Sequence, residues 1–188
     1  METLNHSFFM YINSFAGQNF IVDKLGIIIG EYMPYLFIGI EVWLYFFKKL
    51  KKEALYAFYA VLLGLILNQI IGLFYFHPRP FMDGLGQTLV YHVSENSFPS
   101  DHTTFMASIA FALIFIRNTR SLGFFLLLLA IIGGMARVFI GVHYPFDILG
   151  SLFTSIVSAT FVVLFKNYFD KMSTLIFRIE EWIFKGKI

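Results

Sequence analysis

The sequence predicts an all-α integral membrane protein, a bundle of five or six transmembrane helices with an amphipathic helix at each end. The chain of 188 residues is 58% hydrophobic and only 14% charged, and its mean hydropathy is +0.72. Soluble domains are far less apolar. Its net charge of +2 is too small to indicate a nucleic-acid partner, so none is expected.

Three long apolar runs are the clearest predicted spans: Leu25–Phe47, Leu55–Phe76 and Ile148–Phe165. The second and third contain no charged residue, and only Glu31 and Glu41 interrupt the first. As helices, all three are long enough to cross a hydrocarbon core of about 30 Å.

Two further runs are weaker as predicted spans. Thr103–Ile116 is short, and Leu122–Val142 contains Arg137. Both reach across the bilayer if their polar ends lie at the interface. No linker or repeat interrupts the pattern, so we expect one domain over residues 1–188.

The two ends of the chain read as amphipathic helices. Residues 1–24 lack the basic start and the cleavage site of a signal peptide, so we expect them to be retained. Phe8, Phe9, Ile12, Phe15 and Ala16 fall on one helical face, and Asn13, Ser14, Gln18 and Asn19 on the other. This pattern favours a helix in the membrane interface, and a sixth crossing is the alternative. From Phe169 onward, a second amphipathic helix is expected on the cytoplasmic leaflet, with Trp182 near headgroup depth.

The basic residues give a topology signal. Most of them fall in two loops and the tail: Lys48, Lys49, Lys51, Lys52, Arg117, Arg120, Lys166, Lys171, Arg178, Lys185 and Lys187. In a five-span layout these segments share one side of the membrane, which should be cytoplasmic. Arg79, Arg137, His77, His92, His102 and His143 then lie on the outward side. The long Pro- and Gly-containing loop over residues 77–99 is either a substrate gate or a simple connector.

Two arginines at the ends of apolar segments suggest phosphate chemistry. Charged groups within a membrane protein are costly and are usually functional. Arg79 and Arg137 are planar bidentate donors that suit phosphate oxygens. Taken singly, either arginine could also be an interfacial residue whose side chain extends to the headgroups.

The run Pro99-Ser100-Asp101-His102 directly precedes an apolar helical segment. Ser97 or Ser100 is therefore expected as the N-cap, with free backbone N–H groups that can bind an anion. Because a carboxylate would repel phosphate, we expect the Asp101 side chain to point away from the site. Simple capping would explain the serine and the proline but would leave His102 without a role.

The spacing Arg137-x5-His143-x3-Asp147 is the sharpest signal. Pro145 suits the first turn of the last span, which places His143 just before that helix and Asp147 within its first turn. Asp147 can then hold one imidazole nitrogen and leave the other free as a base or a nucleophile.

These residues resemble the type 2 phosphatidic acid phosphatase superfamily, and within it the bacitracin-resistance branch of undecaprenyl-diphosphate phosphatases. The matching motifs occur in order as Arg79-Pro80, Pro99-Ser100-Asp101-His102 and Arg137-x5-His143-x3-Asp147. Three positions depart from the family pattern. The family lysine falls on Gly72, where His77 or Asn68 is the candidate substitute, the family glycine is Asp101, and the family serine is Ala136.

The resemblance implies hydrolysis of undecaprenyl diphosphate to undecaprenyl phosphate and inorganic phosphate on the outer face of the bacterial cytoplasmic membrane. His143 would be the nucleophile that becomes a phosphohistidine, Asp147 its stabilising partner, and His102 the general acid and base. Arg79, Arg137, Ser100 and the backbone of Asp101 would bind the phosphate. No metal and no cofactor are implied, and the expected partners are the polyprenyl diphosphate and membrane lipids. The alternatives are another lipid substrate, phosphatidylglycerol phosphate or phosphatidate, or an anion or lipid transporter.

Overall fold

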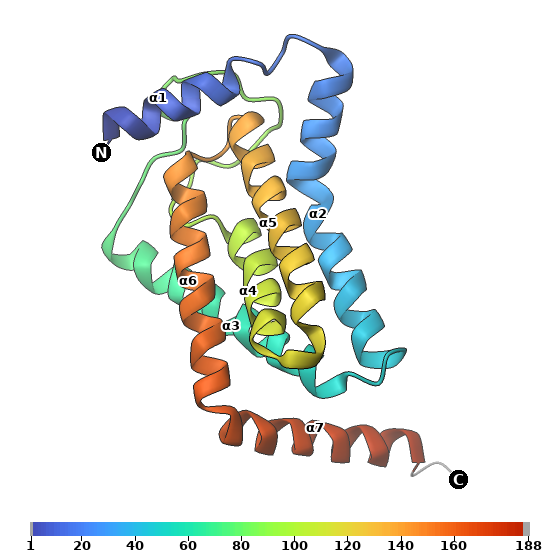
Figure 1. The fold of residues 1–188 in the computed structure, drawn as a ribbon. Helices are drawn as coiled ribbons and strands as arrows, with labels where there is room; N and C mark the ends of the chain where they lie inside the picture. The colour runs from blue at the N-terminus through green and yellow to red at the C-terminus, as the bar shows by residue number, and fades with distance from the viewer. Residues whose placement is uncertain (1, 186–188) are drawn as a thin grey trace.

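The computed structural model describes residues 2–185, and within that range the regular secondary structure is entirely helical (Figure 1). The helices are α1 (Glu2–Asn13), α2 (Phe20–Phe46), α3 (Lys51–Phe74), α4 (Asp101–Phe115), the short 3-10 helix η1 (Arg117–Thr119), α5 (Arg120–Phe139), α6 (Pro145–Leu164) and α7 (Lys166–Lys185). The predicted all-α membrane bundle is thereby confirmed. Lys187, part of the predicted basic tail, lies outside the described residues.

Four of the described helices are long and apolar enough to cross a membrane: α2, α3, α5 with η1, and α6. They agree with the predicted runs to within a few residues at most ends. The fifth predicted span is α4, whose 15 residues give a length of only about 22 Å. Helix α4 packs against α3, α5 and α6 and forms the centre of the bundle (Figure 1).

Small side chains allow the neighbouring helices to approach α4 closely, as is common between membrane helices. At Gly123 of α5, an added Cβ would lie 2.5 Å from the backbone nitrogen of Ile114. Facing α6, hydroxyls pair across the interface, with Thr104 3.3 Å from Thr154 and Ser108 3.4 Å from Ser158. These contacts fix the register of α4 against α6, and both helices begin at the candidate site.

Helix α1 lies across one end of the bundle (Figure 1) and has only 12 residues, about 18 Å. It is too short for the alternative of a sixth crossing. The predicted faces were partly wrong, because Asn13 is buried. Its amide donates to the backbone oxygens of Gln87 and Phe139, both at 2.8 Å, and so ties α1 to the long loop and to the end of α5.

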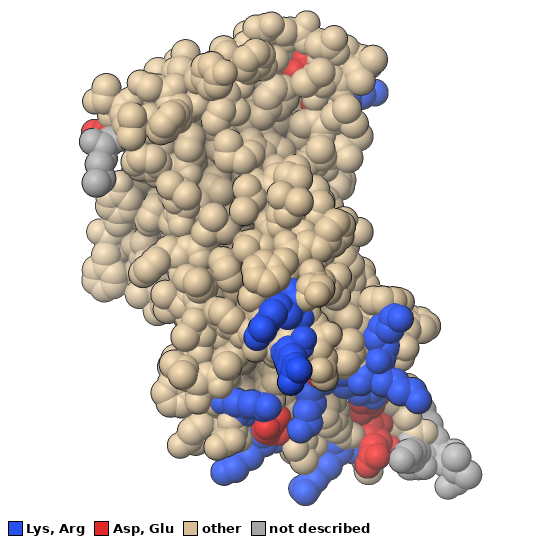
Figure 2. Space-filling model, in the orientation of Figure 1, with Lys and Arg blue, Asp and Glu red and all other residues tan. Residues whose placement is uncertain are grey.

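Helix α7 turns away from α6 and lies across the opposite end of the bundle (Figure 1). Glu180 pairs with Lys51 at 2.5 Å, and Asp170 pairs with Lys52 at 3.4 Å, so α7 is tied to the start of α3. Most of the lysines and arginines visible in Figure 2 gather at this end, while the loop over residues 75–100 and α1 lie at the other. Trp182 is 78% exposed.

Candidate active site

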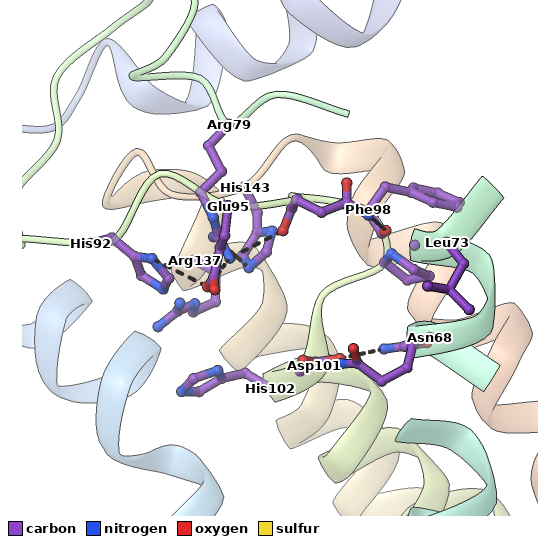
Figure 3. Close-up of a pocket in the computed structure, with 14 residues that line it drawn as sticks. Asn68, Leu73, Arg79, His92, Glu95, Phe98, Asp101, His102, Arg137 and His143 are labelled. Atoms are coloured by element: carbon purple, nitrogen blue, oxygen red, sulfur yellow. Dashed lines mark hydrogen bonds and ion pairs between the residues drawn. The ribbon is translucent and has the colours of Figure 1, made fainter. Parts of the chain in front are cut away.

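A cavity of about 390 Å³ lies between the long loop, the end of α3, the start of α4 and the turn between α5 and α6 (Figure 3). It brings together most of the predicted site residues. Its lining includes Asn68, Gly72, Arg79, His92, Glu95, Asp101, His102, Arg137 and His143. Segments far apart in the sequence therefore converge on one polar pocket.

His143 is 2% exposed and lies in the turn that joins α5 to α6. Asp147 caps the start of α6, because its Oδ2 accepts the backbone N–H of Tyr144 at 2.7 Å. That oxygen lies 3.4 Å from Nδ1 of His143, which confirms the predicted proximity of the pair. Ser97 was not predicted to belong to this group. Its hydroxyl donates to Asp147 at 2.5 Å and lies 3.2 Å from Nδ1 of His143.

Two contacts select the same tautomer of His143. The Ser97 hydroxyl hydrogen is used on Asp147, so its oxygen is available to accept Nδ1–H. On the other side of the ring, Arg79 Nη1 lies 3.2 Å from Nε2, and a guanidinium can only donate. Nε2 therefore carries the lone pair. Burial lowers the pKa of His143 to about 4, which keeps the ring neutral near pH 7.

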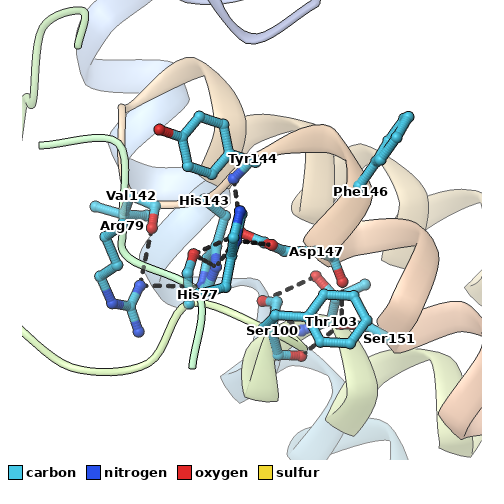
Figure 4. A network of polar contacts seen from close by, with 12 residues as sticks. His77, Arg79, Ser100, Thr103, Val142, His143, Tyr144, Phe146, Asp147 and Ser151 are labelled. Carbon is cyan, nitrogen blue, oxygen red and sulfur yellow. Dashed lines mark hydrogen bonds and ion pairs between the residues drawn. The ribbon is translucent and has the colours of Figure 1, made fainter. Parts of the chain in front are cut away.

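His77 lies behind this group and outside the cavity lining. Its Nδ1 is 3.1 Å from Oδ1 of Asp147 (Figure 4), and this hydrogen bond raises the pKa of His77 above its ordinary value. A protonated His77 would help keep Asp147 ionised. The geometry thus makes His77 a support for Asp147. Because His77 lies outside the cavity lining, its position does not favour the role of substitute for the family lysine.

Arg79 is 5% exposed, and its contacts aim it at His143. Nη1 donates to the Val142 backbone oxygen at 2.9 Å (Figure 4). Nη2 donates to Glu95 at 3.1 Å and to the Asn96 backbone oxygen at 3.4 Å. Within residues 2–185, its buried Nε has no hydrogen-bond partner.

Arg137 is fully buried near the end of α5, and Nη1 donates to Glu31 and to the Gly30 backbone oxygen, both from α2. Its Nε and Nη2 are buried with no hydrogen-bond partner among the described residues. Buried donors without partners are rare in folded proteins. Together with Nε of Arg79, they leave the pocket with unused positive donors, which is the property that a phosphate site needs.

The start of α4 follows the prediction in part. Ser100 is the N-cap, and its hydroxyl, fully buried, accepts the Thr103 backbone N–H at 3.5 Å. The cavity lining includes both of its neighbours, Pro99 and Asp101, but not Ser100. His102 lines the cavity and lies below Arg137 in the view of Figure 3.

Asp101 differs from the prediction that it points away from the site. Its side chain lines the cavity, where Oδ1 accepts the Asn68 amide at 2.8 Å (Figure 3). The second Asn68 N–H donates to Thr104 at 2.9 Å. Both amide hydrogens are therefore in use, so Asn68 does not stand in for the family lysine as a free donor. Gly72, at the lysine position, lines the cavity, and a Cβ added there would lie 3.1 Å from Nδ2 of Asn96.

Sequence reasoning did not assign Glu31, Glu95 or Ser97 to the site. Glu31 stood out only as a charge in an apolar run, and Glu95 only as a loop residue. Their partners lie in other elements, and Glu31 is 106 positions from Arg137. No local spacing could have identified these contacts.

Comparison with known proteins agrees with the geometry. The family described as the PAP2 superfamily matches residues 53–171, a segment that contains every motif residue of the site. Undecaprenyl-diphosphatase BcrC of Bacillus subtilis (strain 168) is 35% identical over 182 residues, covering 96% of this chain and 93% of that protein.

Two further relatives are similar over most of their length. Bacitracin transport permease protein BcrC of Bacillus licheniformis is 31% identical, covering 98% of this chain and 93% of that protein. Putative undecaprenyl-diphosphatase YbjG of Escherichia coli (strain K12) is 29% identical, covering 84% and 80%. In fold, the crystal structure of Aquifex aeolicus LpxE is similar, with a TM-score of 0.72 at 23% identity, covering 86% of this chain and 96% of that one. The chain belongs to the PAP2 superfamily.

Proposed function

We propose that this protein hydrolyses undecaprenyl diphosphate to undecaprenyl phosphate and inorganic phosphate. The observation that carries the proposal is the meeting of a neutral, oriented imidazole with two arginines that retain unused donors in one cavity. Relatives that share about a third of their residues with this chain are named for undecaprenyl diphosphate, which supports this lipid as the substrate.

In the proposed reaction, Nε2 of His143 attacks the terminal phosphorus. The bond between that phosphorus and the bridging oxygen breaks, and undecaprenyl phosphate leaves. Asp147 and Ser97 hold the ring by Nδ1 and stabilise the positive charge that develops on it. Water then cleaves the phosphohistidine and regenerates the neutral ring.

Arg79 and Arg137 stabilise the charge on the transferring phosphoryl group, which is spread over its nonbridging oxygens. The backbone N–H groups at the start of α4 add an anion-binding helix terminus, and the roles of Ser100 and Asp101 in phosphate binding stay predictions. His102 protonates the leaving oxygen and then activates the water. Its position in the cavity lining supports this role.

We further propose that the site faces the outside of the cytoplasmic membrane. The cavity is lined by residues of the long loop and of the helix ends beside it. The loop lies at the end of the bundle opposite α7 (Figure 1), and α7 with its neighbouring loops carries most of the basic residues. Basic segments remain preferentially on the cytoplasmic side.

Phosphate release from three lipids tests the substrate assignment. Purified wild type and His143→Ala are assayed with undecaprenyl diphosphate, phosphatidylglycerol phosphate and phosphatidate. We expect the wild type to prefer the diphosphate and the variant to be inactive on all three. A preference for either monoester would replace the proposed substrate by that lipid.

A transporter is the second candidate, because one relative is named a bacitracin transport permease. Transport of an anion or lipid requires no covalent step at His143. Uptake by proteoliposomes that persists in His143→Ala, with no phosphate release by wild type, would favour transport.

A further inference from the structure

The arginine beside the reactive nitrogen already has a carboxylate partner. Arg79 Nη2 donates to Glu95 Oε1 at 3.1 Å, and Glu95 lines the same cavity as His143 and His102 (Figure 3). A carboxylate oxygen at this distance from a guanidinium nitrogen occupies a position that a phosphate oxygen would otherwise take. Phosphate bound beside Nη2 would therefore compete with Glu95 and be repelled by it.

The two partners differ greatly in exposure. The Arg79 side chain is 6% exposed, whereas that of Glu95 is 56% exposed. Ion pairs with an exposed partner contribute little net stability, because the released group is readily hydrated. Glu95 can thus leave Arg79 at low cost, while Arg79 itself stays fixed through Nη1, which donates to the Val142 backbone oxygen.

The segment that carries Glu95 is held mainly at its ends. Leu89 N–H donates to the Ile140 backbone oxygen at 3.0 Å, and the Asn96 side chain bonds Tyr75, His77 and Phe98. For residues 90–95, the structure shows no backbone hydrogen bond to another part of the described chain. Glu95 can therefore swing out while Asn96 and Ser97 keep their places.

We propose that Glu95 is a specificity-determining residue that acts as an internal competitor for the phosphate subsite on Arg79. This inference rests on the proposed phosphatase function and adds a selection rule to it. A terminal phosphate with two negative charges and three free oxygens displaces Glu95. Anions that bind Arg79 weakly, such as singly charged phosphodiester headgroups, are held off. Released inorganic phosphate must also compete with Glu95, so its binding is weakened.

Removal of the carboxylate should tighten the binding of inorganic phosphate. Phosphate can bind only while Glu95 is away from Arg79, so the apparent Kd for phosphate rises by the inverse of the fraction of time in which Arg79 is free. For a partly exposed ion pair that factor is about five. Calorimetry of Glu95→Gln with inorganic phosphate should accordingly give a Kd about fivefold lower than that of wild type. The inhibition constant of phosphate in the lipid-diphosphate assay should fall by the same factor. Glu95→Ala should behave alike, since neither variant carries the charge.

Glu53→Gln is the matched control. It also removes one carboxylate charge, but in the first turn of α3, whereas the cavity lies at the last turns of that helix. Its Kd for phosphate should equal that of wild type. An unchanged or higher Kd in both folded Glu95 variants would overturn the inference. Failure of the proposed function would look different: wild type would release no phosphate from the lipid, while calorimetry would still report on Glu95.

Discussion

The hydroxyl of Ser97 lies 3.2 Å from Nδ1 of His143, while its hydrogen is donated to Asp147. The serine thus bridges the imidazole and the carboxylate, whose own separation is 3.4 Å. Together with Arg79 on the opposite ring nitrogen, this arrangement fixes which nitrogen of His143 carries the lone pair.

Ser97→Ala tests that arrangement. Loss of a group that orients a functional histidine typically costs about tenfold to a hundredfold, and we expect kcat to fall by that factor with little change in KM. Steady-state kinetics with the lipid diphosphate measures it. Ser94→Ala, on the same loop but exposed and outside the cavity lining, should keep wild-type kcat. Equal activities of the two variants would remove Ser97 from the mechanism.

Glu31→Gln tests the orientation of Arg137. Glu31 and the Gly30 backbone oxygen hold Nη1, so that Nε and Nη2 stay unpaired and available to the substrate. Replacing the charged partner should lower kcat/KM by about tenfold, the cost of weakening one charge-assisted contact. Glu41→Gln on the same helix lies outside the cavity lining and serves as the control. A wild-type kcat/KM in Glu31→Gln would contradict this role.

His102→Ala should affect two substrates differently. A diphosphate releases a stabilised lipid monophosphate, whereas phosphatidate releases an alkoxide that depends strongly on protonation. We therefore expect a smaller loss of kcat with undecaprenyl diphosphate than with phosphatidate, measured with one enzyme preparation. Equal losses on the two lipids would mean that His102 does not protonate the leaving group.

The protonation of His143 is directly measurable. Burial lowers its pKa to about 4, so the ring should stay neutral down to well below the ordinary value of about 6.5. The unfolded chain binds this proton first as the pH falls, so the stability associated with a neutral His143 is present above pH 6.5 and is lost between about 6.5 and 4. Histidine-selective NMR titration of wild type against His143→Gln assigns the signal. A His143 pKa at or above 6.5 would be inconsistent with the buried neutral ring.

The membrane helices were predictable because hydrocarbon imposes long uncharged runs, and Leu55–Phe76 became α3 with its end shifted by only two residues. The pairing of His143 with Asp147 was predictable because Pro145 marks the helix start between them. Such local rules also narrowed the N-cap of α4 to Ser97 or Ser100, and the structure has Ser100 there.

The partners of the site residues could not be predicted in the same way. Glu31 reaches Arg137 from a different helix, and Glu95 reaches Arg79 from an irregular loop whose path follows no periodicity. The orientation of Asp101 was wrong because the prediction considered only repulsion from phosphate. It omitted Asn68, whose amide holds the carboxylate in the cavity lining.

Trapping the intermediate shows whether His143 accepts the phosphoryl group. Turnover of undecaprenyl diphosphate that carries ³²P in its terminal phosphate is stopped rapidly without acid, and the protein is digested into peptides. We expect an acid-labile, base-stable label on the peptide that contains His143. The label should be absent from His143→Ala, which should also lose phosphate release. A label on another residue, or full turnover by His143→Ala, would contradict this role of His143.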